Sequence, residues 1–311
     1  MLPDGDQINE CVDLTASNRE EWLELSMEVP GGSDSWTAMG LNPWKSRMAL
    51  WAERWRPTEP DGLSQNEAVR LGTLLEPVVA DEYARATGRK IFDPGRFRIL
   101  RSAKHPWMFA TLDREIPPFD SRGPGVLEIK TTGAAHADEW DEEPPIGPMT
   151  QIQHQMVVTG CRWGSLAVLI GGQRFRWIDV EYHPEFAELL VEEERAFWDL
   201  VRRRVPPDPD EKPSTRQAIE GMFPRDKGET IELTPEAEEW ARRRRELKDR
   251  MKRMEEELAG VENRIKLALG DAAAGVLPDG TGFSWKLQRR PEHVVPAAEF
   301  RVLREIKGRT K

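Results

Sequence analysis

Cysteine is scarce in this sequence of 311 residues and occurs only at Cys11 and Cys161. Two distant cysteines build neither a disulfide framework nor a four-cysteine zinc or iron–sulfur site, and such scarcity is typical of a reducing compartment. No apolar run approaches the length that crosses a membrane, and the N-terminus lacks the basic-then-apolar pattern of a secretory signal. We therefore expect a soluble, cytoplasmic protein without a membrane partner.

The sequence also lacks an excess of positive charge. It has 45 lysines and arginines against 55 acidic residues, which gives a formal net charge of -10. This balance excludes a simple basic coat on DNA. It leaves room for an enzyme with a local basic channel, because phosphate contacts depend on where the cations lie. The length suits one large domain or two ordinary ones.

The stretch from Phe109 to Lys130 contains the residues with the clearest chemistry. Two β-rich runs flank a Pro/Gly loop over 117–125 and predict a hairpin. Side chains alternate along a strand, so Glu128 and Lys130 share one face, and pairing about the loop places Asp113 opposite Glu128. Neighbouring carboxylates repel unless a cation lies between them, and Mg²⁺ prefers oxygen ligands. The pattern favours a metal-dependent phosphodiester hydrolase, although Glu-x-Lys alone is usually a solvated face.

Two further segments border apolar helical patterns. Gly31-Gly32-Ser33-Asp34 precedes a helix and offers free N–H groups and a hydroxyl for a phosphate, with an ordinary helix cap as the alternative. A capping box at Ser64 and Glu67 predicts a long helix that ends at Gly88. We expect its core stripe at Leu71, Leu74, Leu75, Val78 and Val79.

Polar residues on two predicted helices are candidates for the same site. Glu76 lies beside the apolar stripe, immediately before Pro77, which should kink the helix. It is either functional or a rim carboxylate paired with an arginine. Gln151 and Gln155 are four residues apart and share one helix face. Their amides suit a metal-bound water or a phosphate, and a plain polar face explains them equally well.

The remaining pattern divides the chain into three parts. Residues 1–205 form the first domain, and it closes with two strands joined at Gly171-Gly172 and a helix from Pro184 to Arg204. Residues 206–233 look like a Pro-rich linker. Residues 234–311 hold a charged helix and a short β tail. Apolar residues form a seam along this helix at alternating four- and three-residue steps, as in a coiled coil: Leu247, Met251, Met254, Leu258, Val261 and Ile265.

The ordered set of motifs resembles the YqaJ-like viral recombinase family. That family belongs with the lambda-type alkaline exonucleases in the PD-(D/E)XK nuclease superfamily. The resemblance covers roughly residues 19–205 and rests on these segments: Gly31-Gly32-Ser33-Asp34, Gly40-Leu-Asn-Pro43-Trp44-Lys45-Ser46, Gly72-Thr-Leu-Leu75-Glu76-Pro77, Leu112-Asp113, Leu127-Glu128-Ile129-Lys130-Thr131 and Gln151-Ile-Gln153-His154.

The resemblance implies an α/β (α+β) fold with a restriction-endonuclease-like core, in which helices flank a central mixed β-sheet. It implies one or two Mg²⁺ or Mn²⁺ ions held by Asp113, Glu128, the Ile129 carbonyl and Glu76. Lys130 would contact the attacking water or the phosphate, with Gln151 nearby. The residues expected to contact DNA phosphates are Ser33, Lys45, Ser46, Thr131 and Gln155.

The resemblance also implies a function. Relatives digest linear double-stranded DNA from 5′ ends and leave 3′ single strands for recombination with a single-strand annealing protein of the RecT or Bet type. Some are ring-shaped trimers, so we expect a homo-oligomer encoded by a phage or prophage. Relatives usually carry a basic residue seven positions before the motif serine, where this chain has Ser26.

Four other functions compete with this one. The alternatives within nucleases are an endonuclease and a RecB-like single-strand nuclease. A non-catalytic DNA-end-binding scaffold, with the C-terminal helix contacting partners, would need no intact carboxylates. A carboxylate-pair glycosidase would have no use for the adjacent lysine.

Overall fold

The computed structural model describes residues 11–27, 31–55, 67–95, 97–291, 297 and 299–306. The chain divides into two compact units, Met1–Phe223 and Pro224–Lys311. Among the residues that the structure describes, no helix combines the length and the apolar character that a membrane crossing requires.

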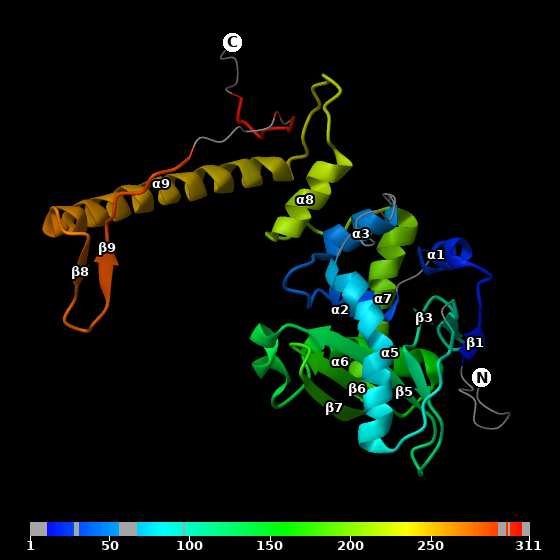
Figure 1. Ribbon diagram of the computed structural model, residues 1–311. Helices are drawn as coiled ribbons and strands as arrows, with labels where there is room; N and C mark the ends of the chain where they lie inside the picture. Colours follow the sequence, from blue (N-terminus) through cyan, green and yellow to red (C-terminus); the bar gives the residue numbers. More distant parts are fainter. Residues whose placement is uncertain are drawn as a thin grey trace. The chain divides into compact units, whose positions relative to one another are not determined.

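A four-stranded mixed sheet forms the centre of the first unit (Figure 1). Its strands are β4 (Arg114–Ile116), β5 (Gly125–Thr132), β6 (Trp163–Ile170) and β7 (Arg174–Glu181), in that order. β5 is antiparallel to β4 and parallel to β6, and β7 is antiparallel to β6. The predicted hairpin on either side of Pro117 to Gly125 is therefore present, as is the turn at Gly171-Gly172, whose φ angles are 59° and 74°.

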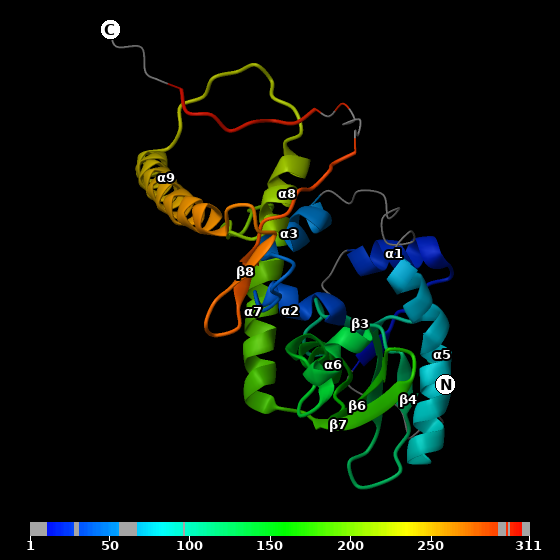
Figure 2. The ribbon, with the colours of Figure 1, turned by 60° about the vertical axis from the view of Figure 1, so that its left-hand side comes forward.

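Two helices cover opposite faces of this sheet (Figure 2). α5 (Glu67–Thr87) packs Val79, Ala80 and Tyr83 against Leu127 and Ile129. α6 (Ile146–Thr159) makes the crossover between the parallel strands, and its Ile152 and Met156 join the other core with Val126 and Leu166. This is the mixed sheet flanked by helices that the sequence predicts.

Shorter elements surround this centre. A three-stranded antiparallel sheet contains β1 (Cys11–Asp13), β2 (Leu100–Ser102) and β3 (Phe109–Ala110). The helices are α1 (Arg19–Met27), α2 (Ser35–Ala38), α3 (Arg47–Trp55), α7 (Pro184–Arg203) and α8 (Pro213–Met222), with single turns η1 (Gly32–Asp34), η2 (Ala134–His136) and η3 (Asp138–Trp140).

Two sequence expectations differ from the structure. The expected core stripe of α5 is largely solvent-facing, because Leu71, Leu74 and Val78 are exposed and only Val79 is fully buried. Ser64, half of the predicted capping box, lies outside the described residues. The proposed linker 206–233 also contains α8, whose buried Met222 packs with Trp51 of α3. The first unit accordingly ends at Phe223, not at 205.

The second unit consists of α9 (Glu236–Leu269) and a small hairpin of β8 (Ala274–Val276) and β9 (Gly282–Ser284). The predicted charged helix is thus present, and it ends at Gly270, whose φ is 55°. None of the residues of α9 is buried. The predicted short β tail is present as this hairpin, whose second strand ends at Ser284.

Candidate functional site

Strand β5 brings the predicted carboxylates together. Arg114 pairs with Leu127 in the ladder between β4 and β5, so the preceding Asp113 lies beside Glu128. The Ile129 N–H donates to Asp113 Oδ2 at 2.7 Å, which fixes that carboxyl against the edge of β5. Glu128 is 2% exposed and lies among polar partners on the face that α6 covers. The register predicted from the loop is therefore correct.

Lys130 and two glutamines of α6 bind the Glu128 carboxylate. The Lys130 ammonium donates to Glu128 Oε1 and, at 2.8 Å, to Gln151 Oε1. The Gln151 amide donates to Glu128 Oε1 at 2.7 Å, and the Gln155 amide donates to Glu128 Oε2 at 2.6 Å. The one-turn spacing of the two glutamines thus places both amides on a single carboxylate.

The electrostatics of the site favour a cation. Burial raises the pKa of the Asp113 carboxyl well above its usual value, and the nearby Glu128 carboxylate raises it further. Burial alone would lower the pKa of the Lys130 ammonium, but the Glu128 carboxylate raises it above its ordinary value. A second negative charge at Asp113 is therefore unfavourable without an additional cation.

Glu76 lies close to these groups but already has a partner. Its carboxylate accepts from Arg114 Nη1 at 2.6 Å, and the same nitrogen contacts the Asp113 carbonyl. The arginine-paired carboxylate, one of the two alternatives from sequence, is therefore the state that the structure shows. A cavity of about 350 Å³ is lined by Glu76, Pro77, Asp113 and Arg114, among other residues.

The predicted phosphate contacts are dispersed. Ser33, in η1, is exposed, and Thr131 follows Lys130 on β5 with its hydroxyl near Gly72 of α5. Lys45 forms an ion pair with Glu53 at 2.7 Å. Ser46 is buried, and its hydroxyl caps α3 by accepting the Ala49 N–H, so it serves the helix cap.

A buried His154–Glu194 pair was not identified as a pair from the sequence. Nδ1 of His154 contacts both oxygens of Glu194 of α7, at 2.9 and 3.1 Å, and Nε2 contacts the Phe109 carbonyl at 2.7 Å. Both side chains are fully buried. His154 lies between Gln151 and Gln155, so these contacts fasten the glutamine-bearing helix to α7 and β3. The one local sign of this pair in the sequence is a histidine that lies among three glutamines.

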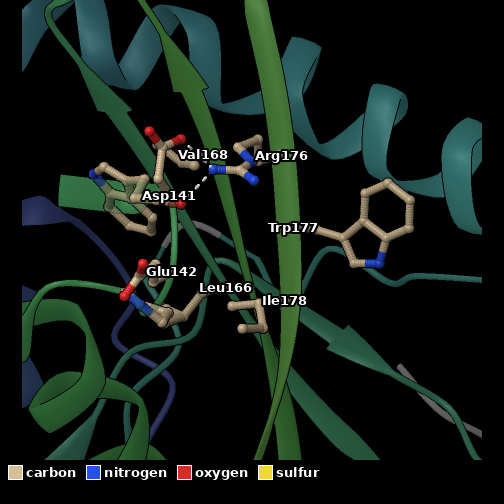
Figure 3. A pocket seen from close by; sticks show the side chains of 9 residues that line it. Asp141, Glu142, Leu166, Val168, Arg176, Trp177 and Ile178 are labelled. Carbon is tan, nitrogen blue, oxygen red and sulfur yellow. Dashed lines mark hydrogen bonds and ion pairs between the residues drawn. The ribbon is translucent and has the colours of Figure 1, made fainter. Parts of the chain in front are cut away.

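A second hollow, of about 100 Å³, is lined by Val168 of β6 and Arg176 of β7 (Figure 3). In the strand register Lys130 neighbours Val168, which in turn neighbours Arg176. Arg176 donates to the Trp140 carbonyl at 2.6 Å and to Asp141 Oδ1 at 2.8 Å. The acidic segment after β5 that contains Asp141 is thus attached to β7.

The donor set fits a hard divalent cation. Asp113 and Glu128 supply carboxylate oxygens, and the Ile129 carbonyl stays the predicted third ligand. In the part of the chain that the structure describes, no three acidic, histidine or cysteine side chains gather as a metal cluster. Water would therefore fill the remaining positions. Gln155 Oε1 is buried beside Glu128 without a hydrogen-bond partner, and a metal-bound water would satisfy it.

Fold and site together define a mixed α+β protein with a carboxylate–lysine–glutamine site at one strand of its central sheet. Residues 21–162 match the model of the YqaJ-like viral recombinase domain. The chain is 31% identical over 265 residues to the uncharacterized protein YqaJ of Bacillus subtilis (strain 168), covering 84% of this chain and 81% of that protein. The chain belongs to the YqaJ-like viral recombinase family.

Solved structures show a more distant likeness. The alkaline exonuclease LHK-Exo from Laribacter hongkongensis aligns with a TM-score of 0.49 at 20% identity, over 60% of this chain and 94% of that one. Its complex with dAMP aligns with a TM-score of 0.48 at the same identity and coverage.

Proposed function

We propose that this protein is a Mg²⁺- or Mn²⁺-dependent deoxyribonuclease that digests linear double-stranded DNA from 5′ to 3′. The observation that carries the proposal is the convergence of Asp113, Glu128 and Lys130 at one strand, with both glutamine amides on the Glu128 carboxylate. Membership in a viral recombinase family supports a role in producing 3′ single strands for an annealing partner.

Each residue has a defined task in this reaction. Asp113 and Glu128 would hold the ion, which when bound lowers the pKa of a water and neutralises charge on the phosphate. Gln151 and Gln155 fix both oxygens of Glu128, so that carboxylate cannot rotate away from the ion. Lys130 stays charged despite its burial because the Glu128 carboxylate raises its pKa, and it would present an ammonium to the phosphate or to the attacking water.

The test is Mg²⁺-dependent release of nucleotides from linear duplex DNA. Lys130→Ala and Glu128→Gln should each reduce the rate by at least about a hundredfold, because one removes an electrostatic contact and the other a metal ligand. Glu143→Gln, which removes an exposed carboxylate outside the site, is the matched control. Circular dichroism and thermal melting establish that the variants fold. Activity that survives in both site variants would rule out this site.

The choice of substrate separates the proposal from its rivals. An exonuclease requires an end, so closed-circular DNA should resist digestion while the same DNA, linearised, is degraded. Strict 5′ polarity predicts faster digestion of a 5′-phosphorylated duplex than of a 5′-hydroxyl duplex. Cleavage of the closed circle would indicate an endonuclease, and digestion of single strands alone would indicate a RecB-like nuclease.

A further inference from the structure

Helix α9 carries an apolar seam that the described residues of the second unit leave largely exposed. Trp240, Leu247, Met251, Met254, Leu258 and Val261 are between 42% and 66% exposed. From Leu247 to Ile265 the seam residues recur at alternating steps of four and three. This spacing keeps one narrow stripe on one side of a helix and is typical of coiled coils, not of a helix that packs on a globular core.

The spacing assigns heptad positions to the central part of α9. Met251 and Leu258 occupy a positions, and Leu247, Met254 and Val261 occupy d positions. The residues beside the seam then form two charged flanks. One flank, at e positions, contains Lys248, Glu255 and Glu262; the other, at g positions, contains Arg243, Arg250, Glu257 and Arg264.

We propose that α9 pairs with α9 of a second copy of this chain in an antiparallel coiled coil. In an antiparallel pair an a residue lies opposite a d residue, so Met251 of one copy would face Met254 of the other. The next layers outward then join Leu247 to Leu258. Four consecutive apolar layers result, with an Arg244 side chain at either end of them. A two-fold axis relates the two copies.

Charge complementarity selects this arrangement. When one helix is reversed, flanks of the same kind meet. With the Met251–Met254 centre, Lys248 comes beside Glu255 of the second copy, and Arg250 comes beside Glu257 of the second copy. Two-fold symmetry makes each of these attractive contacts occur twice. Interhelical ion pairs at such positions determine the choice of partner and orientation in coiled coils.

The parallel arrangement is disfavoured by the same residues. In a parallel pair each g residue meets the e residue five positions later in the partner helix. Arg243 would then face Lys248, and Glu257 would face Glu262, so two of the three central contacts join like charges. A second antiparallel register, centred on Met254 and Leu258, would contain more apolar layers. It would, however, place Glu255 beside Glu255 of the second copy and Glu257 beside Glu257 of the second copy. The first antiparallel register avoids both conflicts, and its one like-charged contact, Arg243 beside Arg264 of the second copy, lies outside the four central layers.

The first test measures the mass of the full-length protein by light scattering after size-exclusion chromatography. Met254→Glu places a charge in the centre of the seam and should halve the mass, because separation of the two α9 helices parts the two copies. Ala259→Glu adds the same charge outside the seam and should leave the mass unchanged. DNA digestion is followed in parallel and should not change, because the inference concerns α9 alone and is independent of the proposed function.

The second test determines orientation by exchanging charges. Glu257→Lys should raise the dimer dissociation constant at least tenfold, and adding Arg250→Glu in the same chain should restore it. In the antiparallel pair, the double variant Arg250→Glu with Glu255→Lys should dimerise more weakly than Arg250→Glu alone. In a parallel pair the same double variant would dimerise as well as the wild type. Rescue by that second combination overturns the proposed orientation.

A mass that Met254→Glu leaves unaltered would overturn the pairing itself. If Arg250→Glu also showed a salt-dependent loss of DNA binding, the basic part of α9 would be assigned to nucleic acid.

Discussion

Asp179 on β7 holds together residues from four segments of the first unit. Arg89 donates to its two oxygens, each at 2.6 Å, and Arg122 and Ser165 donate at 3.0 and 2.6 Å. Burial alone would raise the pKa of Asp179, but these hydrogen bonds, with Arg89 first among them, lower it to about 2. The loop between β4 and β5 is thereby attached to the end of α5 and to β7, behind the site.

This depressed pKa makes stability depend on pH. The contribution of Asp179 is fully present above its usual pKa of 3.8 and is lost as the pH falls through about 2. We expect Asp179→Asn to lower the free energy of unfolding by about 2 kcal/mol at pH 7, since hydrogen bonds to a charged acceptor are lost. The loss should shrink toward pH 2, as urea unfolding at each pH would show. Asp208→Asn, at an exposed site, is the control, and an equal loss at both pH values would contradict the expectation.

Individual site residues were predictable where the signal was local. Asp113, Glu128 and Lys130 followed from strand alternation and from a hairpin around a Pro/Gly loop, both of which act over a few residues. Glu194 gave no such signal, because it lies among other glutamates of α7 and becomes special only when tertiary packing buries it against His154. The role of Arg114 likewise depends on where α5 places Glu76.

At the scale of elements, the close contact of β5, β6 and α6 depends on Gly164. A Cβ at this position would lie 2.7 Å from Val126 Cγ2 and 2.8 Å from both the Val126 carbonyl oxygen and Ile152 Cδ1. The backbone oxygen cannot move aside without disturbing the parallel ladder that also positions Glu128. Gly164 therefore sets how closely β5, β6 and α6 approach one another.

Gly164→Ala should consequently destabilise the protein by about 3 kcal/mol, as expected for overpacking of a dense core. Gly221→Ala in α8 is the matched control, because a Cβ there meets nothing within 4 Å and alanine favours a helix by up to about 1 kcal/mol. Denaturant unfolding compares the two variants with the wild type. Equal effects at the two glycines would show that the close approach at Gly164 carries no energetic weight.

The orientation of α5 shows why an element can be predicted and its buried face missed. Apolar residues occur on more than one side of this helix, so periodicity alone did not single out the face that packs. The residues that pack against the sheet are Val79, Ala80 and Tyr83. The Tyr83 hydroxyl can be buried there because it forms a hydrogen bond with the Ser165 hydroxyl at 2.7 Å. That partner is 82 residues away and leaves no trace in the local pattern.

At the scale of the whole molecule, the boundary between the units decides what belongs to the candidate nuclease. The expected boundary at 205 followed from the prolines after α7, which do end that helix. The chain then returns to the same unit: the Ser214 hydroxyl accepts the Ser46 N–H at 3.0 Å, and Met222 packs into the cluster of Met48 and Trp51. Helix α8 is therefore part of the first unit's core.

Truncation tests this boundary directly. A chain that ends at Phe223 should unfold at the same denaturant concentration as the first unit of the full-length protein and should retain DNA digestion. A chain that ends at Val205 should be about 3 kcal/mol less stable, because it loses the burial of Met222, worth about 2 kcal/mol, and the hydrogen bond from Ser46, worth about 1 kcal/mol. Calorimetry and urea unfolding measure both. If the two chains have equal free energies of unfolding, residues 206–223 act as a linker. If only the shorter chain is destabilised, α8 is a structural component of the candidate nuclease.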